Sequence, residues 1–307
     1  MDLNGEYWTT EELKDQGVSE YQIKRALKAG TLHRLAHGIY MREEPGGWAL
    51  LRALHHRYPE LVFRGHTAVS IYGHRDTVMQ PVLGLVPKGQ RRPGTERVSV
   101  GRPRTINGAE FQGLPVVTPT EAIAEDSMLH RVGRLKFLEQ LYSGFDGRER
   151  FERDHAQLTQ DLQDALAPLL GKCVVGASSQ MERFFHLELR ARGIESIPNF
   201  RLGPYTWDVG VEKSTTVIDL DSLLFHGKEN SRTFIIDRWK ANHAEMMGWG
   251  HLRFTDACLR DPVAKRKAIE EIEHLLEHRA ATGPGQAVAG RVEVGAWEVH
   301  DHLRNVT

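Results

Sequence analysis

The chain has 307 residues, which is long for one hydrophobic core and predicts two or three domains. Hydrophobic residues make up 40% of it and charged residues 26%, a composition that argues against extensive disorder. Because the formal net charge is only −1, any surface that binds nucleic acid must arise from local segregation of charge.

The cysteines and the apolar runs exclude several further classes of protein. Cys173 and Cys258 lie far apart without paired spacing, so neither a disulfide framework nor a cysteine zinc site is expected. The first residues contain no basic region followed by an apolar core, and no apolar run is long enough to span a bilayer. We therefore expect a cytoplasmic protein that has no membrane partner.

Helix and strand patterns predict a multidomain protein of the α/β (α+β) class. We place a winged helix-turn-helix in residues 1–47, a middle α+β domain in 48–176 and a mixed-sheet domain in 177–280. Residues 281–307 are predicted to form a linker and a C-terminal tail, because glycine and proline interrupt any regular pattern there.

Two capping-box patterns open the first domain. Thr9 is followed by Glu12, and Ser19 by Gln22, so each pair predicts the start of a helix. Residues 32–41 then predict a short strand and a turn. Two short helices followed by a β-ribbon are typical of a winged helix-turn-helix.

The second of these helices is expected to present basic residues on its outer face. Lys24, Arg25 and Lys28 would point outward, and Arg34 lies on the ribbon. A cationic helix fits the major groove of double-stranded DNA, where its side chains contact phosphates and guanine edges. The alternative is a basic helix face that is merely solvated.

The middle domain contains a second set of cations. Helices are predicted over residues 131–141 and 152–170, and residues 86–104 predict strands of a small sheet. Arg91 and Arg92 would then lie at a hairpin tip, where a guanidinium group stays charged and grips two phosphate oxygens. The alternative is a hairpin that is kept soluble by its charge.

Two acidic residues on predicted strands carry the main functional hypothesis. Asp208 lies in a strand predicted over residues 205–212, and Asp219 lies in one predicted over 216–221. Burying an unpaired carboxylate is costly, and a hard cation such as Mg²⁺, with Mn²⁺ as its substitute, would relieve that cost. The alternative is that these acids end strands or pair with nearby arginines.

The elements around these acids predict a mixed sheet with helices packed on it. A helix begins near residue 178, and three strands follow it. A helix over residues 231–247 leads to a strand over 249–254, and a helix over 263–278 closes the domain.

This third domain resembles the PD-(D/E)XK nuclease fold, in the subgroup akin to very-short-patch-repair endonucleases. The matching motifs, in chain order, are Ser179-Gln-Met-Glu182, Asp208, Ile218-Asp219-Leu-Asp221-Ser222, His226, Asp237-Arg238, Gly248-Trp249 and Leu252-Arg253-Phe254. The resemblance implies a restriction-endonuclease-like domain that hydrolyses phosphodiester bonds with Mg²⁺.

The resemblance also implies a role for each acidic residue. Asp208 and Asp219 would bind the metal, and Glu182 would bind a second metal or orient a metal-bound water. Asp221 would do the same or hold His226, which would act as general base or steady the scissile phosphate.

Three positions depart from the pattern of that family. Asp219 stands where the pattern usually has glutamate, which shortens the reach to the metal by one methylene. Ser222 replaces a glycine, and Asp221 occupies the place of the catalytic lysine of the wider superfamily. None of these departures removes a carboxylate that the metal site needs.

The first two domains resemble AbiEi-type antitoxins and transcriptional regulators. Gly30-Thr-Leu32 and Gly38-Ile-Tyr40 match the N-terminal pattern of those proteins, and His66-Thr-Ala-Val with Leu114-Pro-Val-Val-Thr118 match the region after it. Pro119-Thr-Glu121 stands where they commonly begin a helix with Arg-Thr. The resemblance implies DNA recognition rather than catalysis.

Two functions follow, and both have double-stranded DNA as a partner. The first is a modular, Mg²⁺-dependent DNA endonuclease (a hydrolase) whose first two domains hold the duplex. The second is a non-enzymatic regulator or antitoxin that binds operator DNA, keeps a degenerate nuclease fold as a scaffold and has a toxin as partner protein. Either function is compatible with a homodimer.

Overall fold

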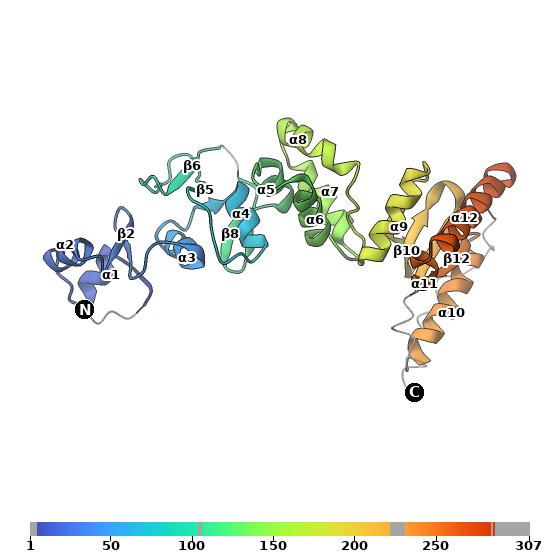
Figure 1. The fold of residues 1–307 in the computed structure, drawn as a ribbon, viewed down its shortest axis with the longest axis horizontal. Helices are drawn as coiled ribbons and strands as arrows, with labels where there is room; N and C mark the ends of the chain where they lie inside the picture. The colour runs from blue at the N-terminus through green and yellow to red at the C-terminus, as the bar shows by residue number, and fades with distance from the viewer. Residues whose placement is uncertain (1–4, 104–105, 222–230, 284, 286–307) are drawn as a thin grey trace. The chain divides into compact units, whose positions relative to one another are not determined.

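The structure is a computed structural model, and it describes residues 5–103, 106–221, 231–283 and 285 (Figure 1). His226 and almost all of the predicted linker and tail lie outside these described residues. The chain divides into two compact units, Met1–Leu141 with Phe151–Gly171 and Tyr142–Arg150 with Lys172–Thr307. Helices and mixed sheets make up both units, which confirms the predicted multidomain α/β class.

The first unit begins with a small winged helix-turn-helix. Both predicted capping boxes are present, since the Thr9 and Ser19 side chains accept hydrogen bonds from the backbone N–H groups of Glu12 and Gln22 at 3.2 and 3.3 Å. A first strand that the sequence did not indicate pairs with the predicted ribbon, in the order β1-β3-β2. The elements are β1 Tyr7–Thr9, α1 Thr10–Asp15, α2 Glu20–Lys28, β2 His33–Ala36 and β3 Ile39–Met41.

A five-stranded sheet follows, with the strand order β6-β5-β4-β8-β7. The strands β4 and β8 run parallel to each other in its centre, and the short hairpin of β7 and β8 forms one edge. The elements are α3 Gly47–Arg57, β4 Val62–Phe63, α4 Gly65–Tyr72, β5 Val82–Leu85, β6 Val98–Gly101, β7 Gly108–Phe111 and β8 Leu114–Val117.

The hairpin predicted within residues 86–104 is wrong. The strands β5 and β6 pair in parallel, so the chain between them is a connection rather than a tight turn. This connection contains Pro87 and Pro93, which donate no backbone hydrogen bond and do not fit the interior of a ladder. Arg91 and Arg92 therefore lie on a loop beside the sheet.

Helices complete the first unit. The predicted helix over residues 152–170 is instead two helices, because the backbone N–H groups of Gln157 and Leu158 bond to carbonyls three residues back and end the first helix. Leu158 is buried at this break, and Thr159 begins the next helix. The helices are α5 Pro119–Glu125, α6 Arg131–Leu141, α7 Gly147–Ala156, which the division into units crosses, and α8 Gln160–Leu170.

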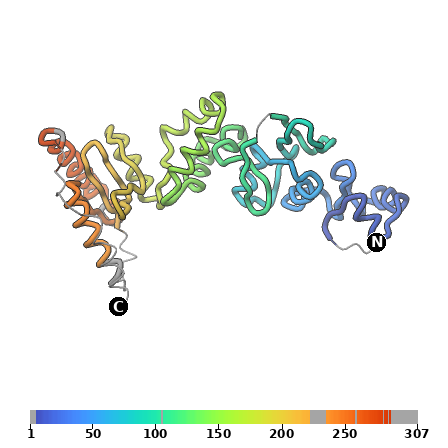
Figure 2. Tube along the Cα trace, turned by 180° about the vertical axis from the view of Figure 1, so that it is seen from behind, coloured from blue at the N-terminus to red at the C-terminus, as the bar shows by residue number. Residues whose placement is uncertain are grey.

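Most of the second unit is coloured yellow to red in Figure 1 and Figure 2. It is built on a four-stranded sheet in the order β12-β11-β10-β9. The strands β9, β10 and β11 form an antiparallel meander, and β12 pairs in parallel with β11 after a helix. The elements are α9 Gln180–Ala191, β9 Ile197–Leu202, β10 Tyr205–Val211, the 3₁₀ turn η1 Glu212–Ser214, β11 Thr216–Asp221, α10 Ser231–Met246, β12 Gly250–Thr255, α11 Asp256–Arg260 and α12 Pro262–Thr282.

Apolar side chains cover both faces of this sheet. On one face, residues of α9 and α12 such as Phe185 and Ile269 pack against Ile218 and other strand residues. On the other face, Ala244 of α10 packs with Val217 and its neighbours. The unit is therefore a three-layer sandwich, and the predicted mixed sheet with helices packed on it is confirmed. Across the part of the chain that the structure describes, no helix has the length and apolar content needed to cross a membrane.

Candidate functional site

The second helix of the winged unit carries an exposed basic face. Lys24, Arg25 and Lys28 are all exposed, as predicted, and none of them forms an ion pair with any described residue. Tyr21 precedes them and is 74% exposed. These four positions follow the helical spacing i, i+3, i+4 and i+7, so they lie on one side of α2. We call Tyr21, Lys24, Arg25 and Lys28 the basic face.

The opposite side of α2 explains why the basic face is exposed. Ile23 and Ala26 are buried there and pack against Trp8, Leu13 and Tyr40 of the small core. This apolar side fixes the rotation of the helix about its axis, because turning it would expose the buried residues. The sequence analysis missed Tyr21, although its spacing of three residues from Lys24 was a usable signal.

The other residues that were predicted to contact DNA lie on an edge strand and on a loop. Arg34 on β2 is exposed, and its guanidinium group donates to the Ala36 carbonyl at 3.3 Å and contacts the His37 ring at 3.0 Å. Arg91 and Arg92 are exposed on the connection between β5 and β6, and neither has an ion-pair partner among the described residues.

In the second unit, Asp208 and Asp219 lie on neighbouring strands, as predicted. Both are one residue beyond the antiparallel pair Val209↔Ile218 of β10 and β11. We call Asp208 and Asp219 the acid pair. Asp208 accepts a hydrogen bond from the backbone N–H of Leu220, 2.6 Å from its Oδ2. Burial raises the pKa of Asp208 to about 7; the Leu220 hydrogen bond opposes this rise, and the charges of Asp219 and Glu182 add to it.

Each oxygen of Asp219 has a nitrogen partner. Lys240 of α10 forms an ion pair with its Oδ1, and the His251 ring on β12 lies 3.1 Å from its Oδ2. Burial acts to raise the pKa of Asp219, but the His251 hydrogen bond and the Lys240 charge outweigh it and hold this pKa below its usual value. The carboxylate therefore stays ionised inside the sandwich.

Glu182 enters from the other layer. It is buried at the start of α9, where its own N–H donates to Ser179 and its Oε2 accepts the backbone N–H of Ser178 at 2.7 Å. Phe185, one turn later, packs on the face of the sheet that α9 and α12 cover. The Glu182 carboxylate thus bonds to the backbone just before Ser179, the N-cap of its own helix, while Asp219 shares the opposite face of the sheet with Val217 and contacts α10.

Arg253 holds Asp221 at the end of β11. Arg253 of β12 donates to both of its carboxylate oxygens, at 2.9 and 3.0 Å, and also reaches Asp237 of α10 at 3.2 Å. Burial acts to lower the pKa of Arg253, but the charges of Asp221 and Asp237 raise it overall. His226, the remaining predicted site residue, lies outside the described residues, so its relation to Asp221 stays a prediction.

A buried histidine that the sequence analysis missed positions the acid pair. His186 of α9 lies 2.7 Å from the Ser196 hydroxyl and 3.4 Å from the backbone carbonyl of Asp208. Since a carbonyl only accepts, His186 Nε2 is the donor and Nδ1 accepts from Ser196. Burial lowers the pKa of His186 to about 4. The neutral ring therefore ties α9 to the strand that carries Asp208.

The arrangement of these carboxylates does not fit a bound metal. Among the described residues, no three His, Cys, Asp or Glu side chains come close enough together to hold one. The reason is geometric: both Asp219 oxygens face Lys240 and His251, and Glu182 and Asp208 each give one oxygen to a backbone N–H. Binding of Mg²⁺ or Mn²⁺ by this set stays a prediction.

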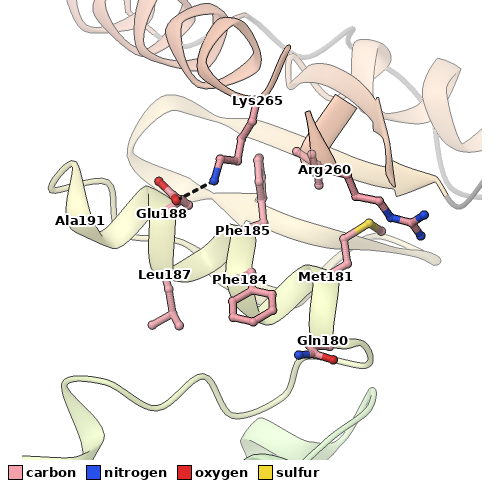
Figure 3. A pocket seen from close by; sticks show the side chains of 10 residues that line it. Gln180, Met181, Phe184, Phe185, Leu187, Glu188, Ala191, Arg260 and Lys265 are labelled. Carbon is pink, nitrogen blue, oxygen red and sulfur yellow. Dashed lines mark hydrogen bonds and ion pairs between the residues drawn. The ribbon is translucent and has the colours of Figure 1, made fainter. Parts of the chain in front are cut away.

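A groove lies elsewhere in the second unit, between α9, α11 and the start of α12 (Figure 3). Met181, Phe184 and Phe185 contribute apolar surface to it, and Lys265 of α12 reaches Glu188 of α9 at 3.0 Å. None of its described lining residues is a predicted site residue.

Comparisons with known proteins bear on the N-terminal region. A family described as transcriptional regulator, AbiEi antitoxin, matches residues 9–42, which confirms the AbiEi resemblance over the winged unit. Among solved structures, the chain is similar to the RV2827C protein from Mycobacterium tuberculosis, with 17% sequence identity and a TM-score of 0.41 over 66% of this chain and 84% of that one. No curated protein matches the sequence.

Proposed function

We propose that this protein is a DNA-binding regulator that recognises double-stranded DNA through its winged helix-turn-helix. The observation that carries the proposal is the basic face of α2, whose cations are exposed and have no ion-pair partner among the described residues. The match of residues 9–42 to AbiEi-type transcriptional regulators supports the same function from an independent direction.

The geometry of the basic face suits a duplex. A helix that presents lysine and arginine along one side lies in the major groove, with its first residues nearest the base edges and its later cations near phosphates. Tyr21 is in the first turn of α2 and Lys28 in its last turn. Arg34 on the wing would contact the backbone beside the groove.

Fluorescence anisotropy of the full chain on labelled duplex DNA tests this function. Lys24→Gln, Arg25→Gln and Lys28→Gln together should weaken binding and flatten its salt dependence, because fewer counterions are released. Lys213→Gln is the control, since Lys213 is an exposed lysine of the second unit. Equal loss in the control, or no loss in the triple variant, would contradict the proposal.

Metal-dependent DNA cleavage is the second candidate function. The acid pair recommends it, because two carboxylates lie on adjacent strands, but the contacts of Asp219 with Lys240 and His251 do not fit a bound metal, so this function ranks second. Incubation of supercoiled plasmid with Mg²⁺ and then Mn²⁺, read as nicked and linear product, tests it. Product that disappears with Asp208→Asn would support the nuclease; no product in either metal would favour the regulator.

A toxin protein is the partner that the regulator function adds, because the matching family is described as an antitoxin. In that case the winged unit binds DNA and another surface of the chain binds the toxin. Co-expression of the full chain with a candidate toxin protein, followed by size-exclusion chromatography, tests this partner. Elution of the two proteins at separate volumes would argue against it.

A further inference from the structure

We propose that Lys240 is the resident cation of the acid pair, so that the second unit holds its strand-borne carboxylates without a divalent metal. The proposal concerns the second unit alone and does not depend on DNA binding by the first. It follows from the disagreement between the nuclease resemblance, which implies a metal here, and the contacts that these residues make.

The Lys240 side chain is enclosed rather than solvated. It is 14% exposed and forms an ion pair with Asp219, whose side chain is 6% exposed. The Lys240 ammonium also lies 5.1 Å from the centre of the Trp207 ring, and Trp207 is fully buried. A desolvated ammonium held between a carboxylate and an aromatic face gains from both contacts. These contacts locate the cation at a defined position.

The position of Lys240 is set by the fold. Asp219 shares its side of β11 with Val217, which packs in the core beneath α10. Lys240 projects from α10 toward this same side and pairs with Asp219 Oδ1. The second oxygen, Oδ2, lies 3.1 Å from His251 Nε2 on β12. The Asp219 carboxylate is thus satisfied by residues from the two elements that flank it.

A divalent cation would have to displace these partners. To reach Asp219 it would expel the Lys240 ammonium, and the two like charges would repel each other in a region of low dielectric constant. A departing Lys240 would also lose its contact with Trp207. Glu182 and Asp208 each already give one carboxylate oxygen to a backbone N–H, so neither offers the metal two free oxygens in exchange.

Isothermal titration calorimetry of the full chain with MnCl₂ and MgCl₂ tests the proposal. Wild type is expected to show no saturable binding at millimolar metal. Lys240→Met keeps an unbranched side chain but removes the charge, so this variant is expected to gain saturable Mn²⁺ binding. Adding Asp219→Asn to Lys240→Met should abolish the gained binding.

Lys213→Met is the matched control. Lys213 also pairs with a carboxylate, Glu195, at 2.6 Å, but the two side chains are 79% and 78% exposed. Removing this lysine uncovers no buried acid, so no metal binding should be gained. Thermal unfolding gives a second measurement, because Mn²⁺ should raise the midpoint of Lys240→Met and leave that of wild type unchanged.

Two outcomes would overturn the proposal. One is saturable Mn²⁺ binding by wild type that Asp219→Asn removes, and the other is a folded Lys240→Met that binds no Mn²⁺. The wild-type titration decides the matter even where Lys240→Met does not fold, since absence of binding supports the proposal and Asp219-dependent binding overturns it. Neither readout involves DNA, so failure here is distinguishable from failure of the proposed regulator.

Discussion

The basic face of α2 and the acid pair of the four-stranded sheet both gather charges of one sign, yet the two regions treat them in opposite ways. Lys24, Arg25 and Lys28 are exposed and form no ion pair with any described residue. Asp219 lies inside the second unit and has Lys240 and His251 as partners. The charges of the first region are hydrated, whereas the buried Asp219 of the second is paired with other side chains of the protein.

Exposure decides which of the two regions is open to a ligand. An exposed cation keeps its hydration until a phosphate arrives, and exchange of counterions then favours binding. A metal gains little free energy from a buried carboxylate that already has protein partners, because those contacts must be broken before the metal can bind. Charged residues suggested a function in both regions of the sequence, but in the folded chain those of the basic face are exposed to a ligand and Asp219 is already paired.

The largest effect is expected from breaking the buried pair. Lys240→Met leaves Asp219 buried with one partner fewer, so the free energy of unfolding of the second unit should fall by roughly 3–5 kcal/mol. Lys213→Met should cost less than about 1 kcal/mol, because the Lys213–Glu195 pair is on the surface. Urea denaturation followed by tryptophan fluorescence measures both. Similar losses in the two variants would mean that Lys240 behaves as a surface lysine.

The next effect concerns the exposed region. Replacing Lys24, Arg25 and Lys28 with glutamine should weaken duplex binding about 100-fold, from roughly 1 kcal/mol for each lost phosphate contact. The slope of log affinity against log salt should fall by about 3, one for each neutralised contact. Anisotropy titrations at several salt concentrations check both values. An unchanged slope would mean that these residues are only a solvated helix face.

A third prediction uses pH to probe the acid pair. The pKa of Asp208 is raised to about 7 in the folded chain, so its favourable contribution exists at low pH and is lost as pH rises through about 7. Asp208→Asn removes the ionised form, and should therefore stabilise the second unit at pH 8 by roughly 1–3 kcal/mol. The gain should shrink as pH falls and vanish only below about pH 4, where Asp208 is protonated in the folded and the unfolded chain alike. A gain that is equal at both pH values would contradict the raised pKa.

The smallest effect is expected at Tyr21. Because this side chain is uncharged, Tyr21→Ala should weaken binding to a selected duplex by about 1 kcal/mol while leaving the salt slope unchanged. Tyr21→Phe should keep most of the affinity if the ring contacts bases, and lose it if the hydroxyl does. Binding to random-sequence duplex should change less than binding to the selected one. A changed salt slope would assign Tyr21 to the phosphate backbone instead.

Local sequence patterns were enough to predict the helix starts and the strands of both regions. Thr9 and Ser19 cap their helices as predicted, because a capping box needs only residues three apart. Apolar periodicity placed Lys24 and its neighbours on the outside of α2, and alternation placed Asp208 and Asp219 on strands. Each of these predictions depends on residues that are near one another along the chain.

The partners of the buried charged residues follow from contacts between segments that are far apart in the sequence. Asp219 is 21 residues from Lys240 and 32 from His251, and no local pattern links the three. The parallel pairing of β5 and β6 was also not predictable from the sequence. Turn residues show where the chain changes direction, but they do not show whether the strands on either side pair in parallel or antiparallel. Packing of the whole core determines which side chains of a crossover helix face the sheet. The acids could thus be located from the sequence, but the lysine that neutralises Asp219 could not.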